Sequence, residues 1–107
     1  MTTFDDRKNA AEKQFALDED LRFKATARRN RLLGLWAAEQ LGKSGEDAAA
    51  YAKSVVMADF EEAGDDDVLR KVKGDLGAGG LSVSDGQLRV RMDELMARAV
   101  EEVRAGR

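Results

Sequence analysis

The chain has 107 residues, of which 43% are hydrophobic and 36% are charged, and its formal net charge at pH 7 is -3. This length favours a single domain, and the composition is typical of a water-soluble chain with enough apolar residues for a small core. Because the chain contains no Cys, His or Pro, disulfides, thiolate catalysis, Cys-based zinc sites, the usual general base and proline kinks are excluded.

Nothing in the sequence predicts a membrane-spanning or secretory segment. No run approaches the ~20 apolar residues that a membrane-spanning helix needs. The N-terminus carries charges throughout and has no apolar segment of the kind found in signal peptides. Together with the absence of cysteine, these features predict a cytoplasmic protein without direct membrane insertion. The small negative net charge also argues against a free-standing nucleic-acid binder.

Glycine is the main break signal in the chain, and residues that favour helices fill the stretches between the glycines. A first helical segment is predicted over about 5–41, where Gly42 is suited to a left-handed cap at its end. A second segment is predicted from Ser44, a candidate N-cap, to Gly64.

Two further helical segments are predicted in the C-terminal half. The third is short: Asp65 or Asp66 could cap its start, and Gly77 is expected to end it. The fourth starts at Ser84, where Gln87 three residues later completes the spacing of a capping box. The glycine-rich link between these segments is longer than the others and could place its leucine and valine against the core.

Apolar residues recur at three- and four-residue spacing in all four segments, which is typical of amphipathic helices. The positions expected to be buried are Leu21, Ala25, Leu32, Leu33, Trp36, Ala48, Ala52, Val55, Val56, Phe60, Val68, Leu69, Val72, Leu76, Leu88, Met92, Leu95, Met96, Ala99 and Val103. Because such helices gain most of their stability from packing, and short connections make neighbours roughly antiparallel, the predicted fold class is all-α. We expect a small four-helix bundle over residues 20–107 and a mobile N-terminal arm over residues 1–19.

The N-terminal arm differs from the rest because it has strong helix propensity but few apolar residues to bury. Its apolar anchors are Phe4, Phe15 and Leu17, and basic residues are interspersed with acidic ones around them. One interpretation is a frayed and solvated helix end, as at many termini. The other is a segment that completes its helix only in the groove of a partner.

No residue pattern identifies an enzymatic reaction or a metal site. The densest carboxylate cluster, residues 65–67, is better explained as an N-cap and an acidic first turn than as a metal site. Consecutive residues of a helix point in different directions, and the spacing is not that of a calcium-binding loop. The GAGG stretch at 77–80 lacks the Lys-Ser/Thr of a phosphate-binding loop and follows no predicted strand, so it is expected to be a turn.

Charge is distributed unevenly along the chain. Residues 1–31 carry eight basic and six acidic residues, whereas residues 46–67 carry one basic and eight acidic residues. One interpretation is internal, with the acidic second segment packed against the basic first. The other is external, with Arg28, Arg29 and Arg31 contacting an acidic protein surface or phosphates. Nucleic acid is disfavoured as the partner because carboxylates lie nearby and no aromatic residues interleave with the arginines.

The sequence over residues 23–72 also carries a family resemblance. It reads FKATARRNRLLGLWAAEQLGKSGEDAAAYAKSVVMADFEEAGDDDVLRKV and resembles the zeta-subunit family of alphaproteobacterial F-type ATP synthases, which are inhibitor proteins. The N-terminal TTFDDR and the C-terminal amphipathic segment are similar to members of the same family, so the resemblance covers essentially the whole chain.

The resemblance implies an inhibitor of ATP hydrolysis, not an enzyme, built as an all-α four-helix bundle with a mobile arm. It implies that the arm enters a catalytic interface between an alpha and a beta subunit, close to the gamma shaft, at the periphery of the inner membrane. The arm residues expected to contact this partner are Phe4, Arg7, Lys8, Lys13, Phe15 and Leu17. No metal or cofactor is implied.

Two other interpretations stay open on the residues alone. The chain could be a small nucleotide- or phosphate-binding helical module that uses Arg28, Arg29 and Arg31 together with the GAGG stretch. It could also be a general protein-interaction bundle with an unrelated partner.

Overall fold

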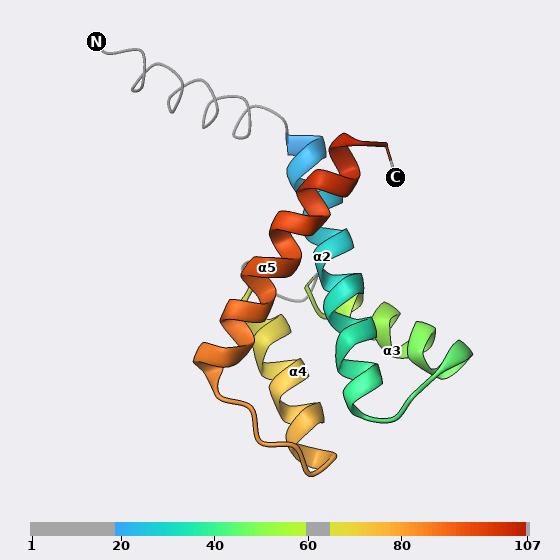
Figure 1. Ribbon diagram of the computed structural model, residues 1–107, viewed down its shortest axis with the longest axis vertical. Helices are drawn as coiled ribbons and strands as arrows, with labels where there is room; N and C mark the ends of the chain where they lie inside the picture. Colours follow the sequence, from blue (N-terminus) through green and yellow to red (C-terminus); the bar gives the residue numbers. More distant parts are fainter. Residues whose placement is uncertain (1–18, 60–64, 107) are drawn as a thin grey trace.

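The computed structural model describes residues 19–59 and 65–106, and these residues form four α-helices and no strand (Figure 1). The helices are α2 (Glu19–Gln40), α3 (Gly45–Ala58), α4 (Asp66–Ala78) and α5 (Asp85–Arg104). The predicted fold class, a small all-α four-helix bundle, is confirmed. The predicted arm lies outside the described residues, apart from Glu19, which is the first residue of α2.

The second helix is the centre of the arrangement. It packs mainly against α3 and α5, and α4 contacts α2, α3 and α5 less extensively. Figure 1 shows α2 and α5 side by side along the long axis, with the start of α2 and the end of α5 at the same end. The connections 41–44 and 79–84 lie at the opposite end of the bundle (Figure 1).

The core is built from the predicted apolar stripes together with Ala37, which the prediction did not include. It consists of buried residues from all four helices: Leu33, Ala37, Val55, Val68, Leu69, Val72, Leu76, Leu88 and Met92. Trp36, Leu41, Tyr51 and Leu95 are partly buried against it, and so are Leu81 and Val83 of the glycine-rich link. Trp36 therefore borders the core, with the guanidinium of Arg91 5.2 Å from the centre of its ring. Phe60 lies outside the described residues.

Three helices end in a left-handed glycine, which is Gly42 after α2, Gly80 after α4 and Gly106 after α5. Gly42 has φ 76°, and after it the N–H of Lys43 donates to the carbonyl of Ala38 at 2.8 Å. The predicted cap at Gly42 is confirmed. The predicted end of α4 at Gly77 is wrong, because the helix continues to Ala78 and the chain reverses at Gly80, which has φ 85°. There the N–H of Leu81 donates to the carbonyl of Leu76 at 2.8 Å, and this Schellman geometry fixes the end of the helix.

The three predicted helix starts differ in how they are capped. The capping box of α5 is confirmed, since Ser84 Oγ accepts from the N–H of Gln87 at 3.1 Å and Gln87 Oε1 accepts from the N–H of Ser84 at 3.0 Å. Ser44 occupies the N-cap of α3, but its side chain makes no cap hydrogen bond. Asp65 occupies the N-cap of α4, and its side chain makes none either. Its carboxylate is instead engaged by Arg29.

The α3 helix is shorter than predicted. It ends at Ala58, with Asp59 as C-cap in a right-handed conformation, rather than continuing to Gly64. In the described part of the chain, no helix is both long enough and apolar enough to cross a membrane.

Candidate functional site: the charged surface of the bundle

The three arginines predicted to contact a phosphate or an acidic partner do not all lie on one face of α2. Arg28 Nη1 donates to Glu102 Oε1 of α5 at 3.2 Å. Arg29 is buried, and its Nη2 donates to Asp65 Oδ1 at 2.7 Å. Arg31 is exposed on the side of α2 that faces α3. Arg29 is therefore turned away from the other two, because neighbouring residues of a helix are rotated by about 100°. Arg28 and Arg31, three residues apart, line the same hollow beside α2.

The buried Arg29 links α2 to the start of α4. Its side chain is 3% exposed, whereas that of its partner Asp65 is 50% exposed. Its Nε donates to Asn30 Oδ1 at 2.9 Å, so both sides of the guanidinium are engaged. The hydrogen bond from Arg29 holds the pKa of Asp65 below its ordinary value. Partial burial acts to raise this pKa, whereas the charges of Arg29 and Arg89 act to lower it.

The two carboxylates after Asp65 are also paired within the bundle. Asp66 accepts from Arg89 of α5 at 3.0 Å, and Asp67 pairs with Arg70. As predicted, this acidic cluster forms the start of a helix, with Asp66 and Asp67 in its first turn. No group of three or more metal-ligating side chains occurs among the described residues.

Arg29 pairs with a carboxylate of the acidic stretch 46–67, as the internal interpretation predicts. That carboxylate, Asp65, precedes α4 and is not part of α3, and Arg28 pairs with Glu102 of α5. The acidic α3 helix does pack on α2, and two small residues, Gly34 and Ala52, lie close together where the helices meet.

A hydrogen-bonded group joins α3 to α4. Tyr51 Oη donates to Asp75 Oδ2 at 2.8 Å, and Lys71 Nζ donates to the same oxygen at 3.2 Å. The Lys71 ammonium also lies 5.4 Å from the centre of the tyrosine ring. Burial, followed by the hydrogen bond to Asp75 and the charge of that carboxylate, raises the pKa of Tyr51.

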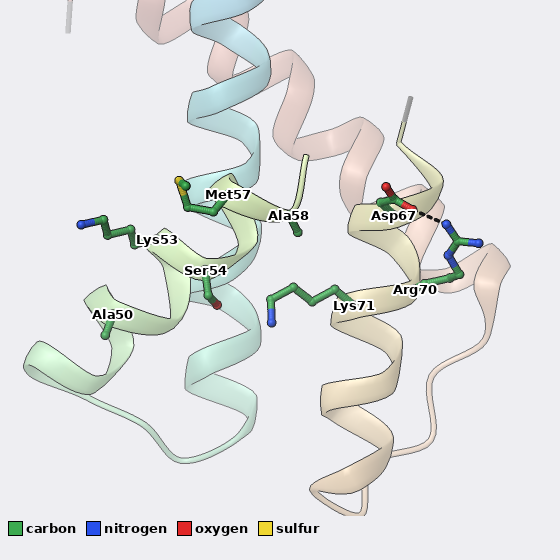
Figure 2. A pocket seen from close by; sticks show the side chains of 8 residues that line it. All are labelled: Ala50, Lys53, Ser54, Met57, Ala58, Asp67, Arg70 and Lys71. Atoms are coloured by element: carbon green, nitrogen blue, oxygen red, sulfur yellow. Dashed lines mark hydrogen bonds and ion pairs between the residues drawn. The ribbon is translucent and has the colours of Figure 1, made fainter. Parts of the chain in front are cut away.

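An open hollow of about 750 Å³ lies between α3 and α4. Figure 2 shows Ser54 and Lys71 pointing toward one another across it, whereas Arg70 points away on the far side of α4. The two α4 cations here are already paired, Arg70 with Asp67 and Lys71 with Asp75. The third cation of this hollow, Lys53 of α3, has no ion pair with another described residue and also lines a hollow between α2 and α3.

Two adjoining hollows lie beside α2, the larger between α2 and the ends of α3 and α5 and the smaller between α2 and α3, and we name them together the α2–α3 groove. The larger, of about 550 Å³, is lined by Lys24, Ala27, Arg28, Arg31, Val56, Val103 and Gly106. The second, of about 270 Å³, is lined by Arg31, Leu35, Ala49, Ala52, Lys53 and Val56. Because Arg31 and Val56 line both hollows, the two form one continuous surface with an apolar floor and basic rims.

The arm residues predicted to bind a partner, Phe4, Arg7, Lys8, Lys13, Phe15 and Leu17, lie outside the described residues, so that prediction stays a prediction.

The alternative interpretation as a phosphate-binding module requires that Arg28, Arg29 and Arg31 lie near the GAGG stretch at 77–80. Gly79 of that stretch lies beside Leu41 at the far end of α2. Leu41 lies thirteen positions after Arg28, which corresponds to about 20 Å along a helix.

Sequence reasoning did not single out Lys53 and Val56 as parts of a surface. The signal was available, since Lys53 is the one basic residue of the acidic stretch 46–67. Val56 has helical spacing to the stripe of α3 and was assigned to the core, but it is only partly buried.

Fold and surface together define a small helical bundle whose chemistry lies in charged and apolar contact surfaces, the kind of structure expected of a protein-interaction module. The chain belongs to the ATPase inhibitor subunit zeta family, whose model matches residues 1–102. It is also similar to a chain solved by NMR in solution, with 50% sequence identity and a TM-score of 0.71. That similarity covers 81% of this chain and 99% of the solved one. None of the curated proteins compared with the chain gave a match.

Proposed function

We propose that this chain inhibits ATP hydrolysis by the F-type ATP synthase by inserting residues 1–19 at a catalytic interface between an alpha and a beta subunit, near the gamma shaft. The observation that carries the proposal is the family match, which spans residues 1–102 and thus includes this arm together with all but the last residues of the bundle. The expected location is the cytoplasm, at the inner membrane through the ATP synthase.

The composition of the arm supports this mode of action. Phe4, Phe15 and Leu17 supply apolar area, at ~1.5–3 kcal/mol for each large side chain that becomes fully buried. Arg7 and Lys8 have charges that could pair with acidic groups of the enzyme, which favours register and association rate. Blocking requires no chemistry, because a helix lodged between two subunits that must move apart stops the catalytic cycle.

The arm needs help from the bundle to bind tightly. Ordering its backbone costs ~1–2 kcal/mol per residue, so a second contact made by the helical body would raise the effective concentration of the arm at its site. The bundle can serve as this body without the arm, because every residue of the core cluster lies between Leu33 and Met92.

The test is the rate of ATP hydrolysis by an isolated catalytic head from the same source, with the full-length chain or with a truncation to residues 20–107. We expect inhibition by the full-length chain and little or none by the truncation. Circular dichroism checks that the truncation keeps its helices. Equal inhibition by both would move the blocking contact into the bundle, and no inhibition by either would overturn the proposed function.

A substitution variant separates the contribution of the anchors from that of arm length. Phe4→Ala/Phe15→Ala removes most of the apolar area of the arm but keeps its charges and length. We expect the concentration needed for half-maximal inhibition to rise at least tenfold, about the effect of losing 1.4 kcal/mol of binding. Unchanged inhibition would show that these anchors are the wrong ones, even if the arm is the inhibitory segment.

A further inference from the structure

We propose that the α2–α3 groove is the surface through which the helical body docks onto an acidic segment with apolar side chains on the ATPase catalytic head. The inference rests on the proposed function and adds to it the position and chemistry of the second contact. It assigns the docking to Arg31, Lys53, Lys24 and Val56.

The first support is the distribution of unpaired positive charge. Lys24, Arg31 and Lys53 line the groove, and none of them has an ion pair with another described residue. Most other cations of the bundle are engaged: Arg28, Arg29, Arg70, Lys71, Lys73, Arg89, Arg91 and Arg98 each pair with a carboxylate. A chain with a net charge of -3 thus keeps three uncompensated cations on one hollowed face, which is the electrostatic complement of an acidic partner.

The second support is the apolar surface in and beside the groove. Its floor is formed by Ala27, Leu35, Ala49, Ala52 and Val56. Phe23, which is 60% exposed near the start of α2, lines a small adjoining hollow that shares Ala27 and Val56 with the groove. Met57, which is 55% exposed, and Lys53 both line the hollow between α3 and α4 (Figure 2), and Lys53 lines the groove as well. An apolar centre with a charged rim is the usual composition of a protein interface.

The third support is the position of the groove relative to the arm. Lys24 is five residues after Glu19, where α2 begins, which is about 8 Å along a helix. A partner that holds residues 1–19 is therefore within reach of the groove, and the two contacts would reinforce one another.

A nucleotide fits this groove less well than a protein segment. Arg28 and Arg29, the neighbouring cations that could add to a phosphate site, are engaged by Glu102 and Asp65. Neither of the two hollows is lined by an aromatic side chain on which a base could stack, and the glycine-rich stretch lies at the other end of α2.

The first test uses the wild-type, full-length chain and the rate at which its lysines react with an amine-specific reagent. Lys24 and Lys53 report on the groove, and the exposed Lys43 at the opposite end of α2 is the matched control. We expect the catalytic head to slow the labelling of Lys24 and Lys53 severalfold and to leave Lys43 unchanged. Equal labelling with and without the head would overturn the proposal, and so would the same protection by ATP alone with no head present.

The second test reverses the charge of the groove in the full-length chain. Arg31→Glu/Lys53→Glu is compared with Lys43→Glu/Lys73→Glu, which changes the net charge equally on exposed positions outside the groove. We expect half-maximal inhibition by the first variant to require at least about tenfold more protein than by the wild type. Because salt screens the attraction between charges, this difference should become smaller at high salt. The control variant should inhibit as the wild type does, and circular dichroism should show equal helix content in both.

The outcomes separate the docking surface from the inhibitory function. If the wild type inhibits and both variants inhibit equally well, the groove is not the docking surface and the proposed function stands. If the wild type does not inhibit the catalytic head at all, both proposals are overturned together.

Discussion

The backbone of α3 lies directly against the α-carbon of Gly34 in α2. A Cβ atom built on Gly34 would lie 2.5 Å from the Cα of Ala52 and 3.1 Å from its Cβ. A glycine in the middle of a helix normally costs ~1 kcal/mol relative to alanine. Here the glycine is what allows the two helices to cross at this short distance.

We therefore expect Gly34→Ala to destabilise the bundle, in spite of the better helix propensity of alanine. The contact is with backbone, which cannot move aside as a flexible side chain could, and overpacking of this kind costs about 1–3 kcal/mol. Thermal unfolding followed by circular dichroism should show a lower midpoint. The matched control is Gly74→Ala in α4, where a new Cβ would meet nothing within 4 Å and where we expect a gain of ~0.5–1 kcal/mol. A stabilised Gly34→Ala variant would contradict the close crossing.

The carboxylates of Asp65 and Asp66 should differ in importance although they are adjacent. Asp65→Ala leaves the buried guanidinium of Arg29 without its charged partner, and an unsatisfied buried donor costs about 1–3 kcal/mol. Asp66→Ala removes an exposed pair with Arg89, which is worth ~0–1 kcal/mol. Both variants remove one negative charge at the start of α4, from the N-cap or from the first turn, so the difference isolates the buried arginine. Urea unfolding of the two variants measures it, and equal losses would argue against a stabilising Arg29–Asp65 pair.

The two serines at helix starts offer a similar comparison. Ser84→Ala removes a side chain that accepts a hydrogen bond from Gln87 in the capping box, and such substitutions cost ~0.5–2 kcal/mol. Ser44→Ala should cost less, because the Ser44 side chain makes no cap hydrogen bond. Unfolding free energies from denaturant titrations test the order. A larger loss at Ser44 would mean that it caps α3 in solution.

Tyr51 should resist ionisation in the folded chain. It is the one tyrosine of the sequence, so phenolate absorbance reports on it alone. Because its pKa is raised in the folded state and is about 10 in unfolded chains, its contribution to stability is complete below about pH 10 and is lost as the pH rises further.

We expect spectrophotometric titration of the folded chain to show phenolate forming well above the pH at which it forms in denaturant. Tyr51→Phe should remove this part of the alkaline dependence of stability, while keeping the ring that packs against Lys71. A folded chain that titrates at the ordinary value would contradict the hydrogen bond between Tyr51 and Asp75.

The helices and most of the core could be predicted from the sequence because both depend on local spacing. The capping box of α5 could be predicted for the same reason, since Ser84 and Gln87 are three residues apart. The pairing of Asp65 with Arg29 could not be predicted, because the two residues are 36 positions apart and only the tertiary fold brings them together. The close crossing of α2 and α3 at Gly34 could not be predicted either, because nothing near Gly34 in the sequence indicates that another backbone passes over it.

The candidate site was harder to predict than the fold. Arg28, Arg29 and Arg31 form one cluster in the sequence, but in the bundle Arg29 is buried and pairs with Asp65. Arg28 and Arg31 line the groove, and Arg28 also pairs with Glu102 of α5. Conversely, Arg31 and Lys53 are 22 positions apart and line the same hollow. Pairing within the bundle decides which cations stay available to a partner, and pairing is a property of the tertiary structure.

The contact between Arg28 and Glu102 has a practical consequence for experiments. It joins the first half of α2 to the last turn of α5, so the beginning and the end of the bundle emerge side by side (Figure 1). An affinity tag or a dye attached after α5 would therefore crowd the start of α2 and the groove beside it. The connection over residues 79–84, at the other end of the molecule, is the better place for a reporter that must not disturb assembly with the enzyme.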